Sequence, residues 1–391
     1  MAIVGAGPAG LLLSQLLHRQ GIESTVLERR DRPHVEQRVR AGVLEHGTAQ
    51  TLREAGVGTR LDAEGLPHDG TELRFARTRH RVDFAELTGR HITVYGQQEV
   101  VKDLVAARLS AGGDLRFEVD GVRLADLDSD RPRVTFRHEG VEQVLDCDFV
   151  AGCDGFHGVS RAHLPPTATV YEHTYPFAWL GILAEAPPSS AELVYAHSDR
   201  GFALHSMRSP RITRMYLQVA PDADLADWSD DRIWSELHHR LATDGGFALT
   251  EGRILDRGIT PMRSFVVTPM QAGRLLLAGD AAHIVPPTGA KGMNLAVADV
   301  RLLARALGGY YADGRTDLLD AYTATALRRV WRSTHFSWWM TSMLHTGPAH
   351  DEFAARLQLA QLDYVAGSRA QATALAENYT GLPYEHPWSY R

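Results

Sequence analysis

A glycine-rich segment at the start of the chain, Gly5-Ala6-Gly7-Pro8-Ala9-Gly10, has the spacing of a dinucleotide-binding fingerprint. In such a turn Gly5 and Gly7 let the backbone approach a pyrophosphate, and Gly10 lets the next helix pack closely on its strand. The N-terminus of that helix adds roughly half a positive charge facing the phosphates. Glu28 ends the next apolar segment, where its carboxylate can accept hydrogen bonds from a ribose. The pattern predicts a nucleotide site; an ordinary tight turn is the alternative.

Two later segments place a carboxylate at the end of an apolar strand: Ala151-Gly152-Cys153-Asp154-Gly155 and Gly279-Asp280-Ala281-Ala282-His283. The carboxylate of Asp280 can hold a ribityl hydroxyl. A helix that begins near Lys291-Gly292-Met293-Asn294 can turn backbone N–H groups toward a flavin ring. Taken alone, Asp280 can equally cap the next helix. The fingerprint and these two segments, which we call the three stations, are three candidate contact sites for one ligand. Three such sites along one chain favour a long, permanently held dinucleotide, and we expect FAD.

The elements that must position these groups can be outlined from the apolar pattern. Residues 2–4 and 24–27 predict strands on either side of a helix at 11–17, which is the context that the fingerprint requires. A β-rich region from 171 to about 265 is interrupted by one predicted helix, at 230–241. After Asp280 the chain is mainly helical. Further predicted elements are a helix at 99–109 and strands at 115–119, 134–137, 144–151, 179–183, 192–195 and 215–219.

This pattern predicts an α/β fold. Its parts are a Rossmann-like FAD-binding domain, an inserted β-sheet substrate domain and a helical C-terminal region. The predicted boundaries are 1–170 continued by 266–330 for the first, 171–265 for the second and 331–391 for the third. The apolar residues of the helical region can form a core or a dimer surface.

Composition excludes some classes of protein. The 41 Lys and Arg residues against 48 Asp and Glu residues give a net charge of -7, so a nucleic-acid partner is not expected. No apolar run is long enough to cross a bilayer, no leader pattern precedes the fingerprint, and no metal-ligand set is predicted. The two cysteines, Cys147 and Cys153, are predicted in one strand and its end, as reduced thiols of a cytoplasmic protein.

With its three stations in this order, the chain resembles the class A flavoprotein aromatic hydroxylases. The resemblance covers essentially the whole chain and is closest at 38–45, 153–158, 279–292, 336–342 and 377–381. It implies an enzyme that holds FAD, uses NADPH or NADH as a transient reductant, and transfers one oxygen atom of O2 to a small aromatic acid. The implied reaction converts 4-hydroxybenzoate to 3,4-dihydroxybenzoate. A homodimer is usual in this family.

The resemblance also assigns the substrate site. The carboxylate of the acid is expected to meet guanidinium forks and hydroxyl groups, which suit it chemically. We expect Arg214, beside an apolar strand, to be buried and to need an anion. Read singly, such strand arginines are more often solvated. The predicted carboxylate ligands are Ser206, Arg208, Arg214 and Tyr216.

The phenol end of the substrate needs other chemistry, because a phenol titrates near pH 10 and reacts faster as its anion. The resemblance implies that Tyr195 and Tyr379 ionise the phenol, with His68 as the outlet for the proton. Pro287 and Thr288 are expected to contact the substrate beside the flavin. The alternatives are half-buried core tyrosines, a histidine in a surface loop, and a rigid turn before a helix.

Further positions are assigned by the resemblance around FAD and the reductant. Those at FAD are Arg40, Gln97 and Asp154, and those at the reductant are Arg29, Arg30, Arg38, His157, Arg161 and Arg263. The chain departs from the family pattern at His34, where a tyrosine is expected, and at Glu36, which adds negative charge. Arginines favour the 2′-phosphate of NADPH and Glu36 opposes it, so both reductants stay open.

Two other functions are compatible with parts of the pattern. A related flavin hydroxylase would share the carboxylate ligands but act on 4-aminobenzoate or 3,4-dihydroxybenzoate. A flavoprotein without oxygenase activity, such as a dehydrogenase or a prenyl-protein escort, would share only the FAD fold. Substrate-stimulated oxygen consumption discriminates the last from the others.

Overall fold

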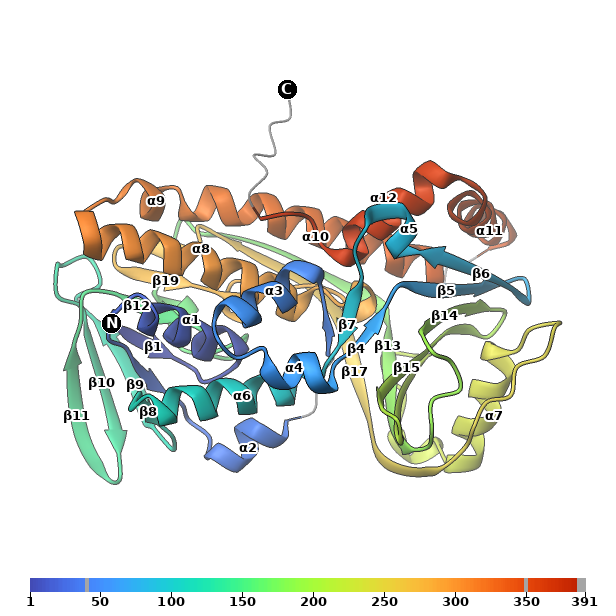
Figure 1. Ribbon diagram of the computed structural model, residues 1–391, viewed down its shortest axis with the longest axis horizontal. Coiled ribbons are helices and arrows are strands. Elements are labelled where there is room, and N and C mark those ends of the chain that lie inside the picture. The colour runs from blue at the N-terminus through green and yellow to red at the C-terminus, as the bar shows by residue number, and fades with distance from the viewer. Residues whose placement is uncertain (39–41, 348–350, 385–391) are drawn as a thin grey trace.

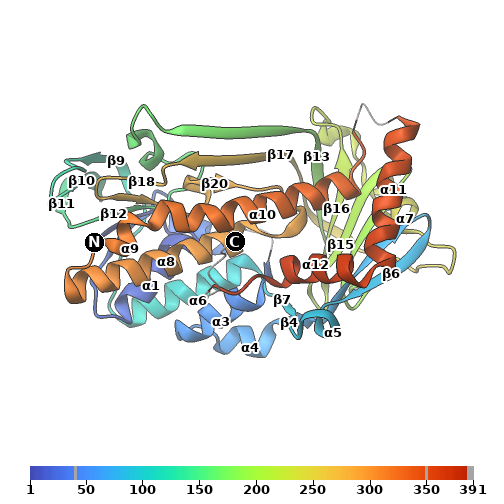
Figure 2. The ribbon, with the colours of Figure 1, turned by 90° about the horizontal axis from the view of Figure 1, so that it is seen from above.

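The structure is a computed structural model that describes residues 1–38, 42–347 and 351–384. It has two parts joined lengthwise. A mostly parallel sheet with α1 (Pro8–His18) and α8 (Gly292–Asp313) forms one, and a large sheet with α7 (Asp230–Leu241) forms the other (Figure 1). Two long strands, β13 (Thr169–Glu185) and β17 (Arg253–Thr268), run between the parts, and α10 (Tyr322–Leu344) spans them (Figure 2).

The first part confirms the predicted strand–helix–strand unit. β1 (Ala2–Val4) lies between β2 (Thr25–Leu27) and β12 (Val150–Gly152), and all three are parallel. The sheet order is β18 (Gln271–Ala272), β19 (Leu275–Leu277), β12, β1, β2, β8 (Asp114–Arg116). Because β1, β12 and β19 are parallel, the turns that follow them meet at one edge of the sheet. The predicted α/β fold is confirmed.

One predicted strand is wrong. Residues 144–151 are divided between two sheets. β11 (Val141–Asp146) pairs antiparallel with β10 (Arg133–His138), whereas β12 lies in the parallel sheet. The remaining strand beside β10 is β9 (Asp120–Ala125). A continuous apolar pattern does not reveal where a chain changes sheets, and Cys147 therefore lies in the connection between two strands.

The second part is built on a large, mostly antiparallel sheet. Its order is β20 (His283–Ile284), β17, β13, β16 (Ile212–Val219), β15 (Gly201–Ser209), β14 (Leu193–Ser198), β5 (Gly70–Phe75), β6 (Thr78–Asp83). Strands β5 and β6 lie outside the predicted 171–265 segment. They join this sheet because β5 pairs in parallel with β14. The domain boundaries given above stay a prediction.

The two faces of this sheet are covered by different helices. One face packs against α7, whose predicted bounds, 230–241, are confirmed; the helix is capped by the Ser229 hydroxyl, which accepts from Arg232 N. The other face packs against α10 and α12 (Arg369–Thr380), so that Tyr195 of the sheet, Phe336 of α10 and Tyr379 of α12 share one core cluster. The candidate substrate residues therefore face the helical C-terminal region.

The remaining elements are short or peripheral. They are α2 (Arg32–Gln37), α3 (His46–Glu54), α4 (Thr59–Glu64), α5 (Phe84–Thr88), α6 (Gln97–Ser110), α9 (Asp317–Asp320) and α11 (Glu352–Gly367), the 3-10 turns η1 (Ser160–His163), η2 (Leu225–Asp227), η3 (Gly279–Ala281) and η4 (Pro287–Gly289), and a small sheet of β3 (Val43–Leu44), β7 (Ile92–Val94) and β4 (Leu66–His68). In the described part of the chain, no helix combines the length and apolar character needed to cross a membrane.

Candidate active site

The three predicted stations converge at the carboxyl edge of the parallel sheet. Cys153 N donates to Val4 O at 2.8 Å, and Ala278 N donates to Gly152 O at 3.0 Å. Gly5 has φ +103°, and a Cβ placed on it would lie 2.4 Å from Cys153 O, so only glycine allows this approach. The fingerprint turn, the Asp154 turn and the Asp280 turn thus lie side by side.

Glu28 stands beside the fingerprint and braces it. Its Oε2 accepts from Ala6 N at 2.8 Å, and its Oε1 accepts from Arg30 N at 2.8 Å. Each carboxylate oxygen can accept a further bond, so the side chain keeps acceptor capacity for a ribose. Glu28 therefore positions the turn and can still contact a nucleotide.

The remaining groups at this edge also suit FAD. Asp154 Oδ2 accepts from Ser160 N and Oγ, both at 2.9 Å, while its Oδ1 is buried with no partner among the described residues. Asp280 is exposed at the strand end. Among the described residues, no side chain caps the first turn of α1 or α8, and neither turn carries an acidic residue. These free N–H groups and acceptors fit a pyrophosphate, a ribityl chain and a flavin ring.

Other predicted FAD residues differ in how far their polar atoms are already hydrogen-bonded within the protein. Gln97 opens α6, and Met293 lies half-buried in the first turn of α8. The Asn294 amide is fully engaged, because its Oδ1 accepts from Glu45 N at 2.9 Å and its Nδ2 donates to Val43 O and Ala290 O. Its side chain thus holds the start of α8, which leaves only its backbone N–H to donate to a cofactor. Arg40 lies outside the described residues.

A buried ion pair holds the Asp280 turn. Asp299 Oδ2 accepts from Gly279 N at 2.9 Å and lies 2.6 Å from His283 Nε2. The two side chains are 2% and 1% exposed. Burial alone would lower the pKa of His283, but the Asp299 carboxylate outweighs it and raises that pKa overall. The pair therefore fixes the turn that carries Asp280.

Replacing Asp299 by asparagine should destabilise the protein by about 3–5 kcal/mol, as expected when one partner of a buried ion pair is removed. A group with a raised folded-state pKa contributes stability that is complete below the unfolded pKa, near 6.5 for histidine. That contribution is lost as pH rises through the folded pKa. Urea denaturation from about pH 6.5 upward should therefore show that the loss of unfolding free energy in D299N becomes smaller as pH rises. A loss that did not change with pH would contradict a protonated His283.

The predicted carboxylate ligands share one face of the large sheet. Tyr195 pairs with Leu204 and Leu204 with Tyr216, while Ser206 pairs with Arg214. Side chains directly opposite, or two residues apart on one strand, lie on the same face. The β15–β16 register shifts between Met207 and Ser209, so Arg208 lies at an irregularity that can re-aim its side chain.

Both arginines are only partly satisfied. Arg208 Nη1 donates to Met207 O at 3.0 Å and lies 3.4 Å from Ser206 Oγ, but its Nε is buried without a partner among the described residues. Arg214 Nη1 lies 3.5 Å from Asp256 Oδ2, too poorly placed for a hydrogen bond, and its side chain is 14% exposed. Burial lowers the pKa of Arg208. Buried guanidinium N–H groups of this kind suit an anion.

Tyr195 and Tyr379 meet in the core. Their hydroxyls are hydrogen-bonded to each other, and the Tyr195 hydroxyl also donates to Thr288 O at 3.0 Å. Each residue is 1% exposed. Burial raises the pKa of both phenols, and the neighbouring Tyr379 raises that of Tyr195 further. Both are therefore neutral near pH 7 and form a chain of hydroxyls that ends at the Thr288 carbonyl.

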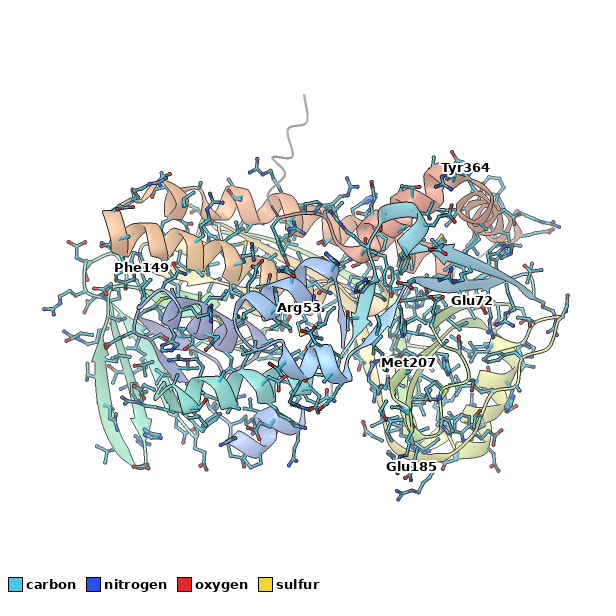
Figure 3. All side chains as sticks on the ribbon, in the orientation of Figure 1. Arg53, Glu72, Phe149, Glu185, Met207 and Tyr364 are labelled. Carbon is cyan, nitrogen blue, oxygen red and sulfur yellow. The ribbon has the colours of Figure 1, made fainter. Side chains whose placement is uncertain are left out.

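His68 does not lie in a surface loop, so that alternative is wrong. It ends β4 and is 1% exposed, and its Nε2 is 3.4 Å from the sulfur of Met207, the residue labelled beside the large sheet in Figure 3. No hydrogen bond between described residues joins it to either tyrosine. Burial lowers the pKa of His68 to about 4, so the ring is neutral near pH 7. Its part in proton transfer stays a prediction.

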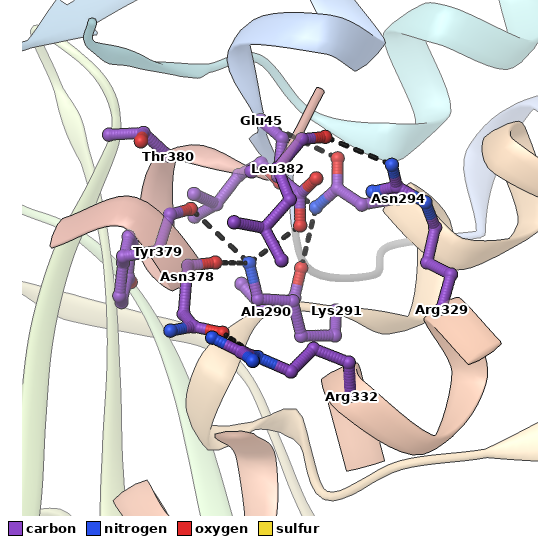
Figure 4. Close-up of polar contacts among 12 residues, drawn as sticks. Glu45, Ala290, Lys291, Asn294, Arg329, Arg332, Asn378, Tyr379, Thr380 and Leu382 are labelled. Atoms are coloured by element: carbon purple, nitrogen blue, oxygen red, sulfur yellow. Dashed lines mark hydrogen bonds and ion pairs between the residues drawn. The ribbon is translucent and has the colours of Figure 1, made fainter. Parts of the chain in front are cut away.

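Thr288 and Pro287 precede α8 in the turn η4. The Thr288 side chain is fully buried and hydrogen-bonds Thr341 Oγ1 at 2.8 Å, so only its carbonyl serves the tyrosine pair. Pro287 is exposed. Sequence reasoning missed the neighbouring Lys291, whose Nζ is 2.6 Å from Glu45 Oε1 and also donates to Asn378 O and Tyr379 O (Figure 4). Burial lowers the pKa of Lys291 despite Glu45.

The predicted reductant residues fall into two groups. His157, Arg161 and Arg263 surround Phe156, with the two guanidinium carbons 4.5 and 4.6 Å from its ring centroid. Arg161 also donates to Phe156 O at 2.6 Å and Ala281 O at 3.3 Å, which ties two FAD stations together. The others are exposed beyond β2; these are Arg29, Arg30 and Arg38. Phe156 was missed as the centre of the first group.

The fold and the site can be compared with known proteins. A family model described as "FAD binding domain" matches residues 1–337. The p-hydroxybenzoate hydroxylase of Acinetobacter baylyi is 48% identical over 98% of this chain and 96% of its own length. The 6-methylpretetramide 4-monooxygenase of Streptomyces rimosus is 26% identical over 82% of this chain, which spans 58% of that relative.

Among solved structures, p-nitrophenol 4-monooxygenase from Pseudomonas putida superposes with a TM-score of 0.80 at 20% identity and covers 98% of both chains. This likeness concerns the fold alone. The family match over most of the chain, and a relative of nearly equal length at 48% identity, agree with the cofactor edge described above. The chain therefore belongs to the FAD-binding family of flavoprotein hydroxylases, and it is an FAD-dependent monooxygenase.

Proposed function

We propose that this protein hydroxylates 4-hydroxybenzoate at the 3 position, giving 3,4-dihydroxybenzoate, with NADPH or NADH as the reductant and O2 as the oxidant. The observation that carries the substrate class is a pair of guanidinium groups, Arg208 and Arg214, that each keep a buried N–H group without a partner among the described residues, on the sheet face that bears Tyr195. A carboxylate supplies the missing acceptors. The relative from Acinetobacter baylyi, named p-hydroxybenzoate hydroxylase, supports the choice of acid.

The tyrosine pair would then ionise the other end of the substrate. A phenol oxygen that replaced the Thr288 carbonyl as the acceptor of the Tyr195 proton would be stabilised as its anion. Tyr379, which is hydrogen-bonded to Tyr195, can pass protons onward. Phenolate formation pushes electron density into the ring and favours attack at the adjacent carbon. The buried face also excludes water from the reacting atoms.

When bound, FAD supplies the redox chemistry by which electrons from NAD(P)H let O2 deliver one oxygen atom to the ring and the other to water. The groups proposed to hold it are Glu28, Asp154, Asp280 and the N-termini of α1 and α8. The proposed contacts for the reductant are the residues around Phe156, namely His157, Arg161 and Arg263, together with the exposed Arg29 and Arg30. Glu36 is ion-paired with Arg32 at 2.6 Å, so its charge opposes a 2′-phosphate less than the sequence implies.

The test is an assay of the purified yellow protein with 4-hydroxybenzoate in air, with NADPH and NADH oxidation followed separately and the products identified. Substrate-dependent oxidation that yields 3,4-dihydroxybenzoate is expected, and the two rates give the reductant. Oxidation that yields only hydrogen peroxide would shift the assignment to a related acid such as 4-aminobenzoate or 3,4-dihydroxybenzoate. No stimulation by the acid would overturn it.

We also propose that the protein is a homodimer that pairs through α11. Phe353, Leu357 and Tyr364 are 71%, 57% and 57% exposed, and with Ala360 they form one stripe at helical spacing. Tyr364 lies at the periphery of the molecule (Figure 3). Two copies of such a stripe can cover each other around a two-fold axis.

A charge placed in this stripe should abolish the dimer. L357E is expected to elute as a monomer in size-exclusion chromatography with light scattering, because a buried, unpaired carboxylate is costly. R356E adds a carboxylate at an exposed position beside the stripe and serves as the control. A dimer that persists in L357E would move the interface elsewhere.

A further inference from the structure

The last turn of α12 and the chain that follows it are held through their backbone by cationic side chains. Lys291 Nζ donates to the carbonyls of Asn378 and Tyr379, Arg90 Nη1 to that of Gly381 at 3.0 Å, and Arg329 Nη2 to those of Leu382 and Pro383 at 3.0 and 2.9 Å. Figure 4 shows the contacts of Lys291 with Asn378 and Tyr379 and that of Arg329 with Leu382. The last carbonyls of a helix have no partner within the helix, so the bonds from Lys291 stabilise the end of α12, while those from Arg90 and Arg329 hold the residues that follow it.

The end of the segment is anchored by an aromatic ring. Tyr384 lies between Arg329 and Arg301, whose guanidinium carbons are 4.6 and 5.1 Å from the ring centroid. The ring also lies against α3, where a Cβ on Gly47 would be 2.8 Å from Tyr384 Cε2. Arg329 thus binds the segment twice, through two carbonyls and through the ring.

The path between helix and anchor is tightly constrained. Gly381 has φ +91°, and a Cβ on it would lie 2.3 Å from Glu45 Oε2. The carboxylate of Glu45 is the partner of Lys291, and its backbone N–H is held by Asn294 in the first turn of α8. The segment after α12 is therefore fitted against the same residues that begin the cofactor-facing helix.

We propose that residues 381–384 form a clasp that positions the hydroxyl of Tyr379 against Tyr195. The main contact that holds this clasp in place is Arg329. Arg329 is a positioning residue: it acts on the last turn of α12 and touches neither tyrosine hydroxyl. The part of this proposal that concerns catalysis rests on the proposed function, in which the tyrosine pair ionises the substrate phenol.

The test compares R329M with R328M in the FAD-loaded enzyme. Methionine keeps much of the side-chain volume and removes both donated bonds, and Arg328 is an exposed neighbour on the same helix. Two readouts are used: amide hydrogen exchange of residues 374–384, and the pH titration of bound 4-hydroxybenzoate by its phenolate absorbance. R329M should exchange faster in this stretch, titrate about one pH unit higher, and hydroxylate roughly tenfold more slowly. R328M should match the wild type.

The outcomes separate the clasp from the proposed function. R329K keeps one cationic donor and should restore part of the titration shift, which a general loss of stability would not do. Unchanged exchange and an unchanged titration in R329M would overturn the clasp, even if its melting temperature fell. If the wild-type enzyme did not ionise bound 4-hydroxybenzoate at all, the proposed role of the tyrosine pair would fail, while the exchange data would still decide whether Arg329 fastens the segment.

Discussion

Replacement of Tyr379 by phenylalanine is expected to lower the rate of 3,4-dihydroxybenzoate formation by about 10²–10⁴-fold, the range that a positioned proton-transfer group contributes. Among the described residues, Tyr379 is the only one whose side chain hydrogen-bonds the Tyr195 hydroxyl, and the change removes that bond. The phenol of the substrate would then lose its path for proton release and would stay neutral. Rapid quench with product analysis measures the rate, and titration of the bound phenol measures its pKa.

The matched control is Tyr175→Phe. Tyr175 is a buried tyrosine of β13 whose hydroxyl bonds Ser264 Oγ at 3.1 Å, remote from the pair in the hydrogen-bond network. Y175F should lose stability of the usual size for one buried hydrogen bond, about 0.5–1.5 kcal/mol, and keep its rate. A Y379F enzyme that still ionised the phenol as the wild type does would remove Tyr379 from the proposed mechanism.

Replacement of Arg208 by methionine is expected to weaken 4-hydroxybenzoate binding by roughly 100-fold or more. A hydrogen bond to a charged group is worth about 1.5–3 kcal/mol, and a guanidinium fork can donate two to one carboxylate. Arg208 is the stronger candidate of the two arginines, because no carboxylate of the described residues forms an ion pair with it, whereas the carboxylate of Asp256 lies 3.5 Å from Arg214. Titration of flavin fluorescence with the acid gives the dissociation constant.

A ligand without the carboxylate isolates this interaction. Phenol itself should bind R208M and the wild type with similar affinity. A cycle of the two proteins and the two ligands then gives the binding free energy that Arg208 gains from the carboxylate. R211M, at the exposed turn after β15, is the control for loss of one positive charge. Equal losses for phenol and for the acid would mean that Arg208 shapes the pocket without binding the carboxylate.

Much of the cofactor edge could be predicted because its information is local. The glycine spacing, the strands at 2–4 and 24–27, and the carboxylates of Glu28, Asp154 and Asp280 each follow from a few adjacent residues. Parallel strands then bring the stations together without further information, since their carboxyl ends share one edge. The helix at 230–241 was equally readable, because its cap and its acidic first turn lie next to each other.

The substrate end depends on contacts that no local pattern encodes. Tyr195 and Tyr379 are 184 residues apart, and Lys291 and Glu45 are 246 apart, so only packing decides that their polar atoms meet. The same holds for His68, which loop-like neighbours suggest is exposed, and for the 144–151 segment, which changes sheets within an unbroken apolar run. The cofactor edge could therefore be predicted from short segments, because the turn chemistry at each strand end is local. Which buried polar groups are left without partners follows only from the packed structure, because it depends on every element around them.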